Sequence, residues 1–424
     1  MKSMKKIGII GMGYVGLPLW INFSKNGFQA VGFDAKKDIV ASLNKAQSYI
    51  GHIPSAGIKK ARKAGSYGTS DMSEIQGVDA IIICVPTPIS KNREPDLQYV
   101  KSVMRQIAPF LRKGQLISLE STTYPGTTEE LIIPVIEEQN FTIGKDFYVV
   151  YSPERENPGG DIRQENITKI LGGATKVCAK KGHAIYSKVF KKVEIVSSIK
   201  IAELTKLLEN IHRAVNLGMI NEFKMICDKM GVDTMEVVDA AATKPFGFVP
   251  YYPGPGWGGH CIPVDPFYFS WKAKEFGMNA RFIELAGEMN LNVQDWLQEK
   301  IVHVLNLDGT ALSTSKILLL GLSYKENVDD ARESPSLRLY NWISVNGGHV
   351  KYSDPHFPKF PSSSKYTFKD SSVKLTSASL KKFDLVVLLT KHKGFDYPLI
   401  KKYSKRIIDT RGVYAPDQKT VFRG

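Results

Sequence analysis

Short apolar runs alternate with helix-length segments along the first part of the chain. Ala80–Val85 is one such run, and its continuous apolar character is typical of a strand covered on both faces, as in a parallel sheet with flanking helices. The pattern therefore predicts a parallel sheet built from the strands Lys6–Ile10, Ala30–Phe33, Ala80–Val85, Leu116–Glu120, Tyr148–Ser152 and Val193–Ser197.

The periodicity changes after these strands. Apolar residues recur at helical spacing from Lys200 to Met230, which predicts one long helix, and Gly231 stands where a C-cap is expected. A stretch rich in glycine and proline, Pro245–Pro266, interrupts the helical pattern, which resumes from Ala280 to about Asn306.

Strand-like runs return in the last part of the chain, at Ile317–Leu320, Val350–Ser353, Leu385–Thr390 and Ile407–Asp409. The first is followed by Gly321 and the second by Asp354, a Rossmann-like layout without the full glycine fingerprint. The whole pattern predicts an α/β protein with two Rossmann-like doubly wound domains joined by a long central helix. We place the domains at residues 1–199, 200–309 and 310–424.

The composition narrows the class of protein. The chain has 424 residues, enough for two or three domains that each bury a core. Its four cysteines are too few and too scattered for a disulfide framework or a CxxC metal site, so we expect a reducing compartment and no bound metal. No apolar run reaches the roughly 18 residues of a membrane span, and the N-terminus lacks the apolar core of a signal peptide. These features predict a cytoplasmic protein without membrane association.

The formal net charge is +15, and +10 of it falls in residues 310–424. Basic residues there form only pairs, such as Lys381–Lys382 and Lys401–Lys402. A nucleic-acid binder would be expected to carry denser basic clusters with interleaved aromatic residues, so we do not expect one. Two interpretations of the charge remain, an ordinary solvated surface and a site for a small anionic ligand.

Gly11, Gly13 and Gly16 follow the first strand in the spacing GxGxxG and open a helical pattern. Glycines at these positions allow a tight turn, close approach of the backbone to a pyrophosphate, and tight packing of helix on strand. The second strand ends in Asp34, whose carboxylate would accept the hydroxyl groups of an adenosine ribose and disfavour a 2′-phosphate. We therefore predict NAD rather than NADP, although two lysines that follow Asp34 argue the other way.

Polar residues follow three other predicted strands, at the strand ends where ligands bind in doubly wound sheets. Thr87 follows the third strand, Thr122 the fourth and Glu154 the fifth. Thr122 would hydrogen-bond a water or a cofactor amide, and Glu154 is a candidate base. Ordinary loop hydroxyls, and a surface pair of Glu154 with Arg155, are the alternatives.

The segment from Pro253 to Asp265 is dense in glycine and contains Cys261. The other cysteines lie in apolar or helical patterns, so Cys261 is a candidate nucleophile, with a structural loop cysteine as the alternative. On the long helix, Lys206 and Asn210 are four residues apart and share a face. They would stabilise one oxyanion together, or they would belong to a solvated helix face.

Taken together, these motifs resemble the UDP-glucose/GDP-mannose dehydrogenase family over essentially the whole chain. The resemblance is carried by Gly11–Gly16, Val85–Pro88, Glu120–Thr122, Ser152–Arg155, Ala202–Asn210, Gly258–Cys261, Tyr324–Lys325 and Arg332–Ser334. His260, Pro263 and Thr243–Phe248 resemble the branch that acts on N-acetylhexosamines. Ser48–Ile50, followed by His52 and Ile53, is most similar to UDP-N-acetylglucosamine 6-dehydrogenases.

The resemblance implies a four-electron oxidation at C6 of a nucleotide sugar, with two NAD⁺ used in succession. The catalytic residues that it implies are Cys261, Lys206, Asn210, Asp265, Glu154 and Thr122. The cysteine would form a thiohemiacetal and then a thioester, and the lysine and asparagine would stabilise the oxyanion. The two carboxylates, through a water near the threonine, would serve proton transfer and hydrolysis of the thioester.

The same resemblance implies binding residues and assembly. For the cofactor these are Gly11, Gly13, Tyr14, Val15, Gly16, Asp34, Val85, Pro86, Thr87, Thr122 and Arg332. For the substrate they are Glu154, Arg155, Lys206, Asn210, Tyr252, Gly254, Gly256, Gly258 and Lys325. The C-terminal domain would bind the UDP half. The long helix would form the core of a homodimer, across which Lys244 or Arg281 would reach the sugar.

Two alternatives to the favoured substrate and mechanism stay open. The same chemistry would also suit UDP-N-acetylmannosamine, UDP-N-acetylgalactosamine or UDP-glucose. The second alternative is a two-electron Rossmann dehydrogenase of the 3-hydroxyacid or 6-phosphogluconate type, which uses a lysine on the long helix without a covalent cysteine. Cys261 in its glycine loop and the second α/β domain argue against that class.

Overall fold

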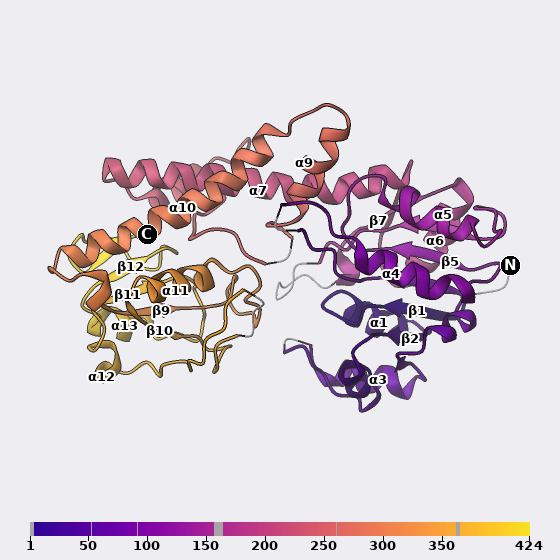
Figure 1. Ribbon diagram of the computed structural model, residues 1–424, viewed down its shortest axis with the longest axis horizontal. Helices are drawn as coiled ribbons and strands as arrows, with labels where there is room; N and C mark the ends of the chain where they lie inside the picture. Colours follow the sequence, from indigo (N-terminus) through magenta and orange to yellow (C-terminus); the bar gives the residue numbers. More distant parts are fainter. Residues whose placement is uncertain (1–3, 52, 91, 157–163, 260, 362–364) are drawn as a thin grey trace. The chain divides into compact units, whose positions relative to one another are not determined.

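Figure 1 shows the computed structural model, which describes residues 4–51, 53–90, 92–156, 164–259, 261–361 and 365–424. The chain divides into two compact units. Unit 1 comprises Met1–Glu209 with Phe267–Asn279, and unit 2 comprises Asn210–Pro266 with Ala280–Gly424. Each unit contains one extended β-sheet.

Unit 1 is built on a sheet with the strand order β3-β2-β1-β4-β5-β6-β7-β8. Neighbouring strands are parallel except β6 and β7, which are antiparallel. The order reverses between β1 and β4, and such a switch point is where doubly wound sheets bind ligands. The strands are β1 Lys6–Ile10, β2 Gln29–Phe33, β3 Tyr67–Thr69, β4 Ala80–Ile83, β5 Leu116–Leu119, β6 Tyr148–Tyr151, β7 Lys169–Gly173 and β8 Val193–Val196.

Helices cover both faces of this sheet, as its apolar strands require. One core cluster joins the sheet to α1, α3 and α6, and a second joins the opposite face to α4, α5 and the start of α7 (Ile199–Met230). The helices that lie wholly within unit 1 are α1 Gly16–Lys25, α2 Lys37–Asn44, α3 Ser55–Lys63, α4 Gln98–Ile107, α5 Ile133–Glu137 and α6 Lys176–Tyr186.

The predicted long helix is present as α7, Ile199–Met230. Gly231 ends it with φ +70°, a conformation that glycine adopts without strain, and the N–H of Val232 closes the turn on the carbonyl of Cys227 at 2.9 Å. Next come α8 Thr234–Ala242, α9 Asp265–Glu275 and α10 Arg281–Asn306. A Cβ added to Gly218 would lie 3.1 Å from Cα of Ala286, so α7 and α10 pack side by side through small residues.

Unit 2 contains a second sheet, in the order β10-β9-β11-β12-β13, with all neighbours parallel. One core cluster packs α10 and α11 on it, and another packs α12 and α13 on the opposite face. Its strands are β9 Lys316–Leu320, β10 His349–Ser353, β11 Leu385–Leu388, β12 Ile407–Asp409 and β13 Val421–Arg423, and its helices are α11 Pro335–Val345, α12 Ser377–Leu380 and α13 Tyr397–Tyr403.

The predicted fold class is confirmed: two Rossmann-like sheets, parallel except for the β6–β7 pair, and a long central helix. The strand pattern missed β3, β7 and β13. Two of these have only three residues, and β7 carries Lys169 at one end and two glycines at the other, so none gives a continuous apolar run. The division into residues 1–199, 200–309 and 310–424 stays a prediction.

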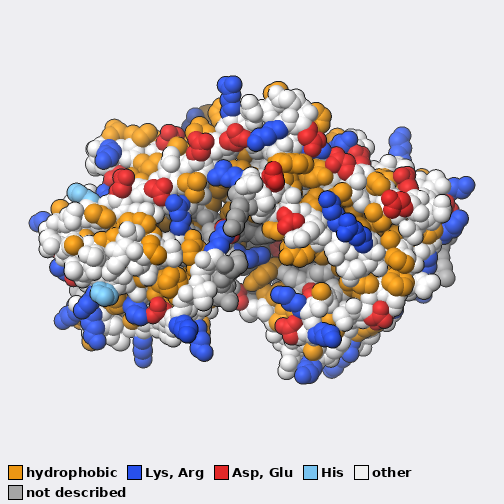
Figure 2. Space-filling view, in the orientation of Figure 1, with side chains coloured by type: hydrophobic (Ala, Val, Ile, Leu, Met, Phe, Trp, Pro, Cys, Tyr) orange, Lys and Arg blue, Asp and Glu red, His pale blue; other side chains and the backbone are white. Residues whose placement is uncertain are grey.

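Two other predictions concern membrane association and the distribution of basic side chains on the surface. Within the described ranges, none of the helices combines the length and the apolar character needed to cross a membrane. On the face drawn in Figure 2, Lys and Arg side chains are spaced along the edge of the C-terminal sheet domain and do not form one block.

Candidate active site

The turn between β1 and α1 is tightly packed. Gly11 has φ +91°, and an added Cβ would lie 2.6 Å from the carbonyl oxygen of Cys84. At Gly16 an added Cβ would lie 1.9 Å from the carbonyl oxygen of Gly11, whereas nothing lies within 4 Å of one added at Gly13. The first and third glycines therefore serve packing. Gly13 leaves open space beside the N-terminus of α1, where a pyrophosphate is expected to bind.

Asp34 lies at the carboxyl end of β2 and faces this turn. Its two carboxylate oxygens accept the N–H groups of Met12 and Lys36, each at 2.9 Å. Because a carboxylate has about four lone-pair sites, acceptor capacity remains for ribose hydroxyls. Tyr49 donates its hydroxyl to the carbonyl of Met12 at 2.6 Å, and burial together with the charge of Asp34 raises the pKa of Tyr49. The turn, the carboxylate and the tyrosine form a cradle that fits NAD.

The other residues predicted to contact the cofactor in this region differ in exposure. Tyr14 and Val15 precede α1 and are half-buried. Val85 is half-buried, Pro86 is exposed and Thr87 is buried, all in the segment that follows β4. The predicted third strand, Ala80–Val85, is too long. Strand β4 ends at Ile83, so the residues from Val85 to Thr87 form a loop at the sheet edge.

Thr122 is half-buried in the segment after β5. Beside it, the hydroxyl of Ser121 donates to the carbonyl of Val85 at 2.7 Å, which joins the ends of β4 and β5. Thr123 is fully buried, and among the described residues its hydroxyl has no hydrogen-bond partner. A buried hydroxyl of this kind is a candidate to bind a ligand or a water, so Thr123 joins the candidate site.

Glu154 is buried and forms an ion pair with Lys169. The Nζ of Lys169 lies 3.2 Å from Glu154 and 2.5 Å from Glu120. Burial opposes the charge of this lysine, but the two carboxylates raise the pKa of Lys169 above its usual value. The alternative interpretation, in which Glu154 forms a surface pair with Arg155, is therefore wrong. The side chain of Arg155 pairs with Glu209 at 2.5 Å, and the carboxylate of Glu154 pairs with the buried Lys169.

Lys206 and Asn210 are both buried, so the alternative of a solvated helix face is wrong. The amide of Asn210 donates to the carboxylate of Asp265 at 2.5 Å. Asp265 is the first residue of α9 and is 1% exposed. Two of the predicted catalytic residues are thus in direct contact within unit 2.

Cys261 is half-buried and lies on the turn that leads into α9. Its carbonyl accepts the N–H groups of Val264, at 3.1 Å, and Asp265, at 2.8 Å. Before the cysteine, the N–H of Gly259 donates to the carbonyl of Arg332 at 2.8 Å. These bonds fix the glycine loop on both sides of Cys261 and keep its thiol outside any strand.

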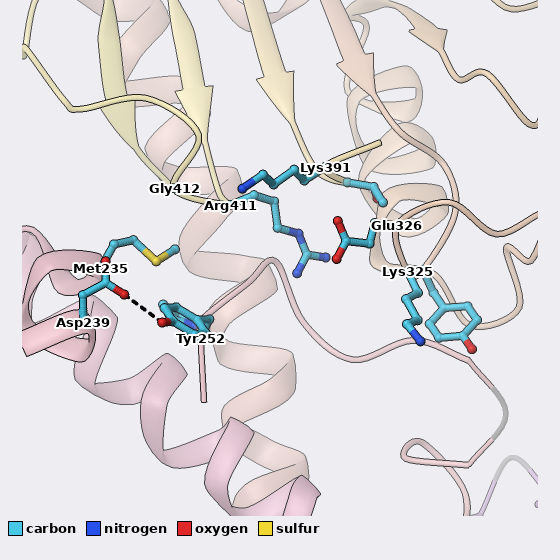
Figure 3. A pocket seen from close by; sticks show the side chains of 11 residues that line it. Met235, Asp239, Tyr252, Lys325, Glu326, Lys391, Arg411 and Gly412 are labelled. Carbon is cyan, nitrogen blue, oxygen red and sulfur yellow. Dashed lines mark hydrogen bonds between the residues drawn. The ribbon is translucent and has the colours of Figure 1, made fainter. Parts of the chain in front are cut away.

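A cavity of about 480 Å³ lies within unit 2, at the carboxyl ends of β9, β11 and β12 (Figure 3). Tyr252 and Lys325, both predicted to bind the substrate, line it. The hydroxyl of Tyr252 donates to Asp239 at 2.7 Å, and burial lowers the pKa of Lys325. The full lining is Met235, Asp239, Tyr252, Pro253, Tyr324, Lys325, Glu326, Thr390, Lys391, Arg411 and Gly412.

The three predicted substrate-loop glycines are close to other groups of unit 2. An added Cβ would lie 2.7 Å from Nη1 of Arg411 at Gly254, 2.9 Å from the Gln294 amide at Gly256, and 2.4 Å from Tyr324 at Gly258. The loop that carries Cys261 therefore packs on two residues of the cavity wall, Tyr324 and Arg411, and only glycine leaves room for this contact.

Several other predicted residues lie apart from the cavity. Both ends of the Arg332 guanidinium donate to Asp330, at 2.6 to 3.1 Å, so its side chain is held by a neighbouring carboxylate. Lys244 and Arg281 are exposed. His52 and His260 lie outside the described residues.

Among the residues that sequence reasoning missed are Lys169 of unit 1, paired with Glu154, and three residues of unit 2: Asn221 and Lys224, which bond Gly254, and Arg411, which lines the cavity. Lys169, Asn221 and Lys224 lie in segments whose pattern is apolar or helical, where a polar residue gives no sign of its partner. Arg411 could have been predicted, because it follows the strand Ile407–Asp409, and polar residues after strand ends were expected to bind ligands.

Family models match three successive parts of the chain. The NAD binding domain of the UDP-glucose/GDP-mannose dehydrogenase family matches residues 5–190, its central domain matches residues 200–292, and its UDP binding domain matches residues 318–416.

Individual proteins match along most of their length. The chain is 34% identical to a UDP-N-acetyl-D-glucosamine 6-dehydrogenase of Pseudomonas aeruginosa, covering 84% of this chain and 83% of that protein. It is 32% identical to protein CapL of Staphylococcus aureus, over 98% of each. The structure of a UDP-N-acetylmannosamine dehydrogenase from Pyrococcus horikoshii superposes with a TM-score of 0.88 at 29% identity, covering 99% of this chain and 98% of that one.

Proposed function

The chain belongs to the UDP-glucose/GDP-mannose dehydrogenase family, and we propose that it oxidises the C6 hydroxyl of a UDP-N-acetylhexosamine to the uronic acid, with UDP-N-acetylglucosamine as the favoured substrate. Its cofactor is NAD, because the chain contains the NAD binding domain of the family, and the cradle of Gly11, Asp34 and Tyr49 fits this cofactor. Held at this turn by Asp34 and Tyr49, NAD⁺ would supply the hydride acceptor for each of the two oxidations.

One observation carries the assignment of the site. The loop that bears Cys261 packs on Tyr324, and Tyr324 lines the cavity at the strand ends of the second sheet. A cavity at that edge of a parallel sheet is the expected place for a nucleotide, and here it lies beside the candidate nucleophile. Lys325, Lys391 and Arg411 bring cations to its wall, which suits a diphosphate.

Cys261 supplies the covalent step of the proposal. Its thiolate adds to the C6 aldehyde, so that a carbon–sulfur bond forms and the carbonyl electron pair moves to oxygen, which takes up a proton. The resulting thiohemiacetal carbon again carries a hydrogen and loses it as hydride, and the oxygen loses its proton, which leaves a thioester. Water then adds to the thioester carbonyl, the carbon–sulfur bond breaks, and the uronic acid leaves with the thiolate restored.

The residues on α7 and α9 support these steps in the proposal. Lys206 and Asn210 stabilise the negative oxygen, and Asp265 holds the Asn210 amide through the bond of 2.5 Å. Glu154 and Asp265 are the candidates to accept the proton of the attacking water, with Thr122 as a ligand of that water. Lys169 pairs with Glu154 at 3.2 Å and gives this carboxylate a fixed partner within the sheet.

UDP-N-acetylmannosamine is the second candidate substrate. The Pyrococcus horikoshii structure of that specificity superposes over nearly the whole chain, while the identity to the glucosamine enzyme is 34%. The two sugars are epimers and differ in the orientation of one group. UDP-N-acetylglucosamine is preferred because of Ser48–Ile50, a segment in which Tyr49 also holds the glycine-rich turn.

We also propose that the enzyme is a homodimer through α7. Met219, Phe223, Ile226 and Met230 share a face of this helix and are each between 39% and 70% exposed. Apolar surface of this extent on neighbouring helical turns is typical of an interface between subunits.

The stoichiometry of NADH tests the proposed reaction. Purified protein with limiting UDP-N-acetylglucosamine and excess NAD⁺ is expected to form two NADH per sugar, because the product is an acid. The same assay with UDP-N-acetylmannosamine compares the two substrates. One NADH per sugar would contradict the four-electron reaction.

The covalent step is tested by Cys261→Ala, with Cys227→Ala as the matched control. Loss of the thiolate is expected to lower steady-state turnover by about 100-fold or more, while nucleotide-sugar binding persists. Cys227 is a buried cysteine of α7 and not a residue of the glycine loop, so its variant is expected to turn over. Wild-type turnover of Cys261→Ala would remove the covalent mechanism.

A further inference from the structure

Lys224 is a buried lysine of α7 that the proposed reaction does not use. It is 1% exposed, and its Nζ donates to the carbonyl of Gly254 at 3.0 Å. Its ammonium also lies 4.8 Å from the centre of the Trp296 ring. The N–H of Gly254 donates in turn to Asn221, at 3.0 Å, one helical turn before the lysine. Two side chains of α7 thus hold both backbone groups of this glycine.

Gly254 connects the lysine to the cavity. It follows Tyr252 and Pro253, which line the cavity, and the guanidinium of Arg411 occupies the space where a Cβ of residue 254 would stand, 2.7 Å away. Arg411 reaches the cavity as well, where Figure 3 shows it pointing into the same space as Glu326. Lys224 and Arg411 therefore lie against the same glycine, and only Arg411 lines the cavity.

The charges around Lys224 are unfavourable to its ammonium. Burial, followed by the charge of Arg411, lowers the pKa of Lys224 to about 7. Arg423 and Lys300 add to this effect, and Asp228 opposes it. The carboxylate of Asp228 forms an ion pair with Lys300 at 2.6 Å. Within the described part of the chain, Lys224 forms no ion pair. The charged groups on the cavity wall are Asp239, Lys325, Glu326, Lys391 and Arg411.

We propose that Lys224 couples the binding of a nucleotide sugar in this cavity to the uptake of one proton from solvent. The inference rests on the proposed function, which places the diphosphate in the cavity. Two negative charges there would offset the repulsion between Arg411 and Lys224, so the lysine gains a proton when the ligand binds. The proton adds to a neutral amine, and no bond of the ligand changes.

The sign of the pH dependence follows from this uptake. Binding that takes up protons becomes weaker as the pH rises through the range between the pKa of the free protein and that of the complex. An anion roughly 8 Å from a buried amine shifts its pKa upward by about one unit or more. At pH 7.5 we therefore expect uptake of about half a proton, and an affinity that falls roughly 3-fold per pH unit near that pH.

The test uses the full chain, UDP-N-acetylglucosamine and no NAD⁺, so that no turnover occurs. Calorimetric titrations at pH 7.5 in PIPES and in Tris, which differ in ionisation enthalpy, give the number of protons taken up. The diphosphate diester of this ligand has no ionisation near neutral pH, so an uptake reports on the protein. The affinity is also measured from pH 6.5 to 8.5.

Two variants locate the proton. Lys224→Gln keeps a donor for the Gly254 carbonyl but cannot titrate, so it is expected to bind the ligand with uptake near zero and an affinity that no longer depends on pH. Lys325→Gln removes the lysine that lines the cavity and is expected to weaken binding while the uptake remains.

Distinct outcomes separate the inference from the proposed function. Uptake that persists in Lys224→Gln, or that disappears in Lys325→Gln, overturns the role of Lys224. Binding to the wild type that is independent of pH also overturns it, and this measurement does not depend on how any variant folds. Absence of binding to the wild type contradicts the proposed function and the inference together.

Discussion

Asp34 and Asp354 stand at equivalent positions in the two sheets, each directly after the second strand of its Rossmann-like unit. Both hold the turn after the first strand, since Asp34 accepts the N–H of Met12 and Asp354 accepts that of Leu322 at 2.6 Å. They differ in what else they meet. Asp354 is buried and paired with His392 at 3.3 Å, whereas Asp34 meets only backbone donors among the interactions described and is partly exposed. Of the two carboxylates, Asp34 is therefore the one proposed to accept a ribose hydroxyl.

This difference predicts the effect of Asp34→Ala. Loss of the acceptor is expected to raise KM for NAD⁺ about 10-fold or more, because hydrogen bonds to a charged group are worth roughly 1.5–3 kcal/mol. The binding of UDP-N-acetylglucosamine, measured without NAD⁺, is expected to stay close to wild type, since its proposed cavity belongs to unit 2.

Asp38→Ala is the control for this prediction, because Asp38 is an exposed carboxylate in the first turn of α2. It is expected to leave KM for NAD⁺ unchanged. An unchanged KM in Asp34→Ala would contradict the role of Asp34, and comparable kcat/KM for NADP⁺ in the wild type would contradict the preference for NAD.

At the scale of elements, one buried ion cluster joins three adjacent strands of unit 1. Glu120 directly follows β5, Glu154 follows β6, and Lys169 begins β7. The lysine side chain is 3% exposed and Glu120 is fully buried, so neither charge is solvated. The cluster includes Glu154, the proposed base. Lys169 therefore contributes both to the stability of the sheet and to the environment of this proposed base.

Lys169→Met is therefore expected to destabilise unit 1 strongly. Removing one partner of a buried ion pair costs about 3–5 kcal/mol, because the remaining carboxylates are left uncompensated. The measurement is the midpoint of thermal or urea unfolding at neutral pH. Adding Glu120→Gln to Lys169→Met is expected to recover part of the loss.

Lys192→Met provides the comparison. Lys192 and Glu194 form a pair whose side chains are 68% and 54% exposed, and such pairs contribute little to stability. Equal midpoints for Lys169→Met and the wild type would show that the buried cluster does not hold the strands.

At the scale of the whole molecule, the apolar face of α7 is the basis of the proposed homodimer. The helix has 32 residues, and the described residues leave the face that carries Phe223 exposed, although α7 packs against α10 on another side. A second copy of the chain is the occupant that the proposed homodimer requires.

Phe223→Glu is expected to shift the protein from dimer to monomer at micromolar concentration, because a charge in the centre of an apolar interface must be desolvated. Sedimentation velocity measures the shift. Val345→Glu, on an exposed position of α11, is expected to leave the assembly unchanged. A monomeric wild type would contradict the proposed dimer.

Much of this fold was predictable, because the decisive signals are local. Apolar runs such as Ala80–Ile83 depend only on burial on both faces, and the spacing of Gly11 to Gly16 depends only on the turn. The strands that were missed lack such a run. In β7, which begins with Lys169 and ends in two glycines, strand formation depends on pairing with β6 and β8.

The candidate site was predictable as a set of residues, but its contacts were not. The sequence by itself determined the fold class, the cofactor turn with Asp34, and the glycine loop around Cys261, since each shows in the pattern and spacing of residues along the chain. Only the tertiary structure decided that Glu154 pairs with Lys169, that Asn210 meets Asp265, and that Lys224 lies buried against Gly254. These partners are far apart in the chain, and their charges acquire meaning only where burial removes water.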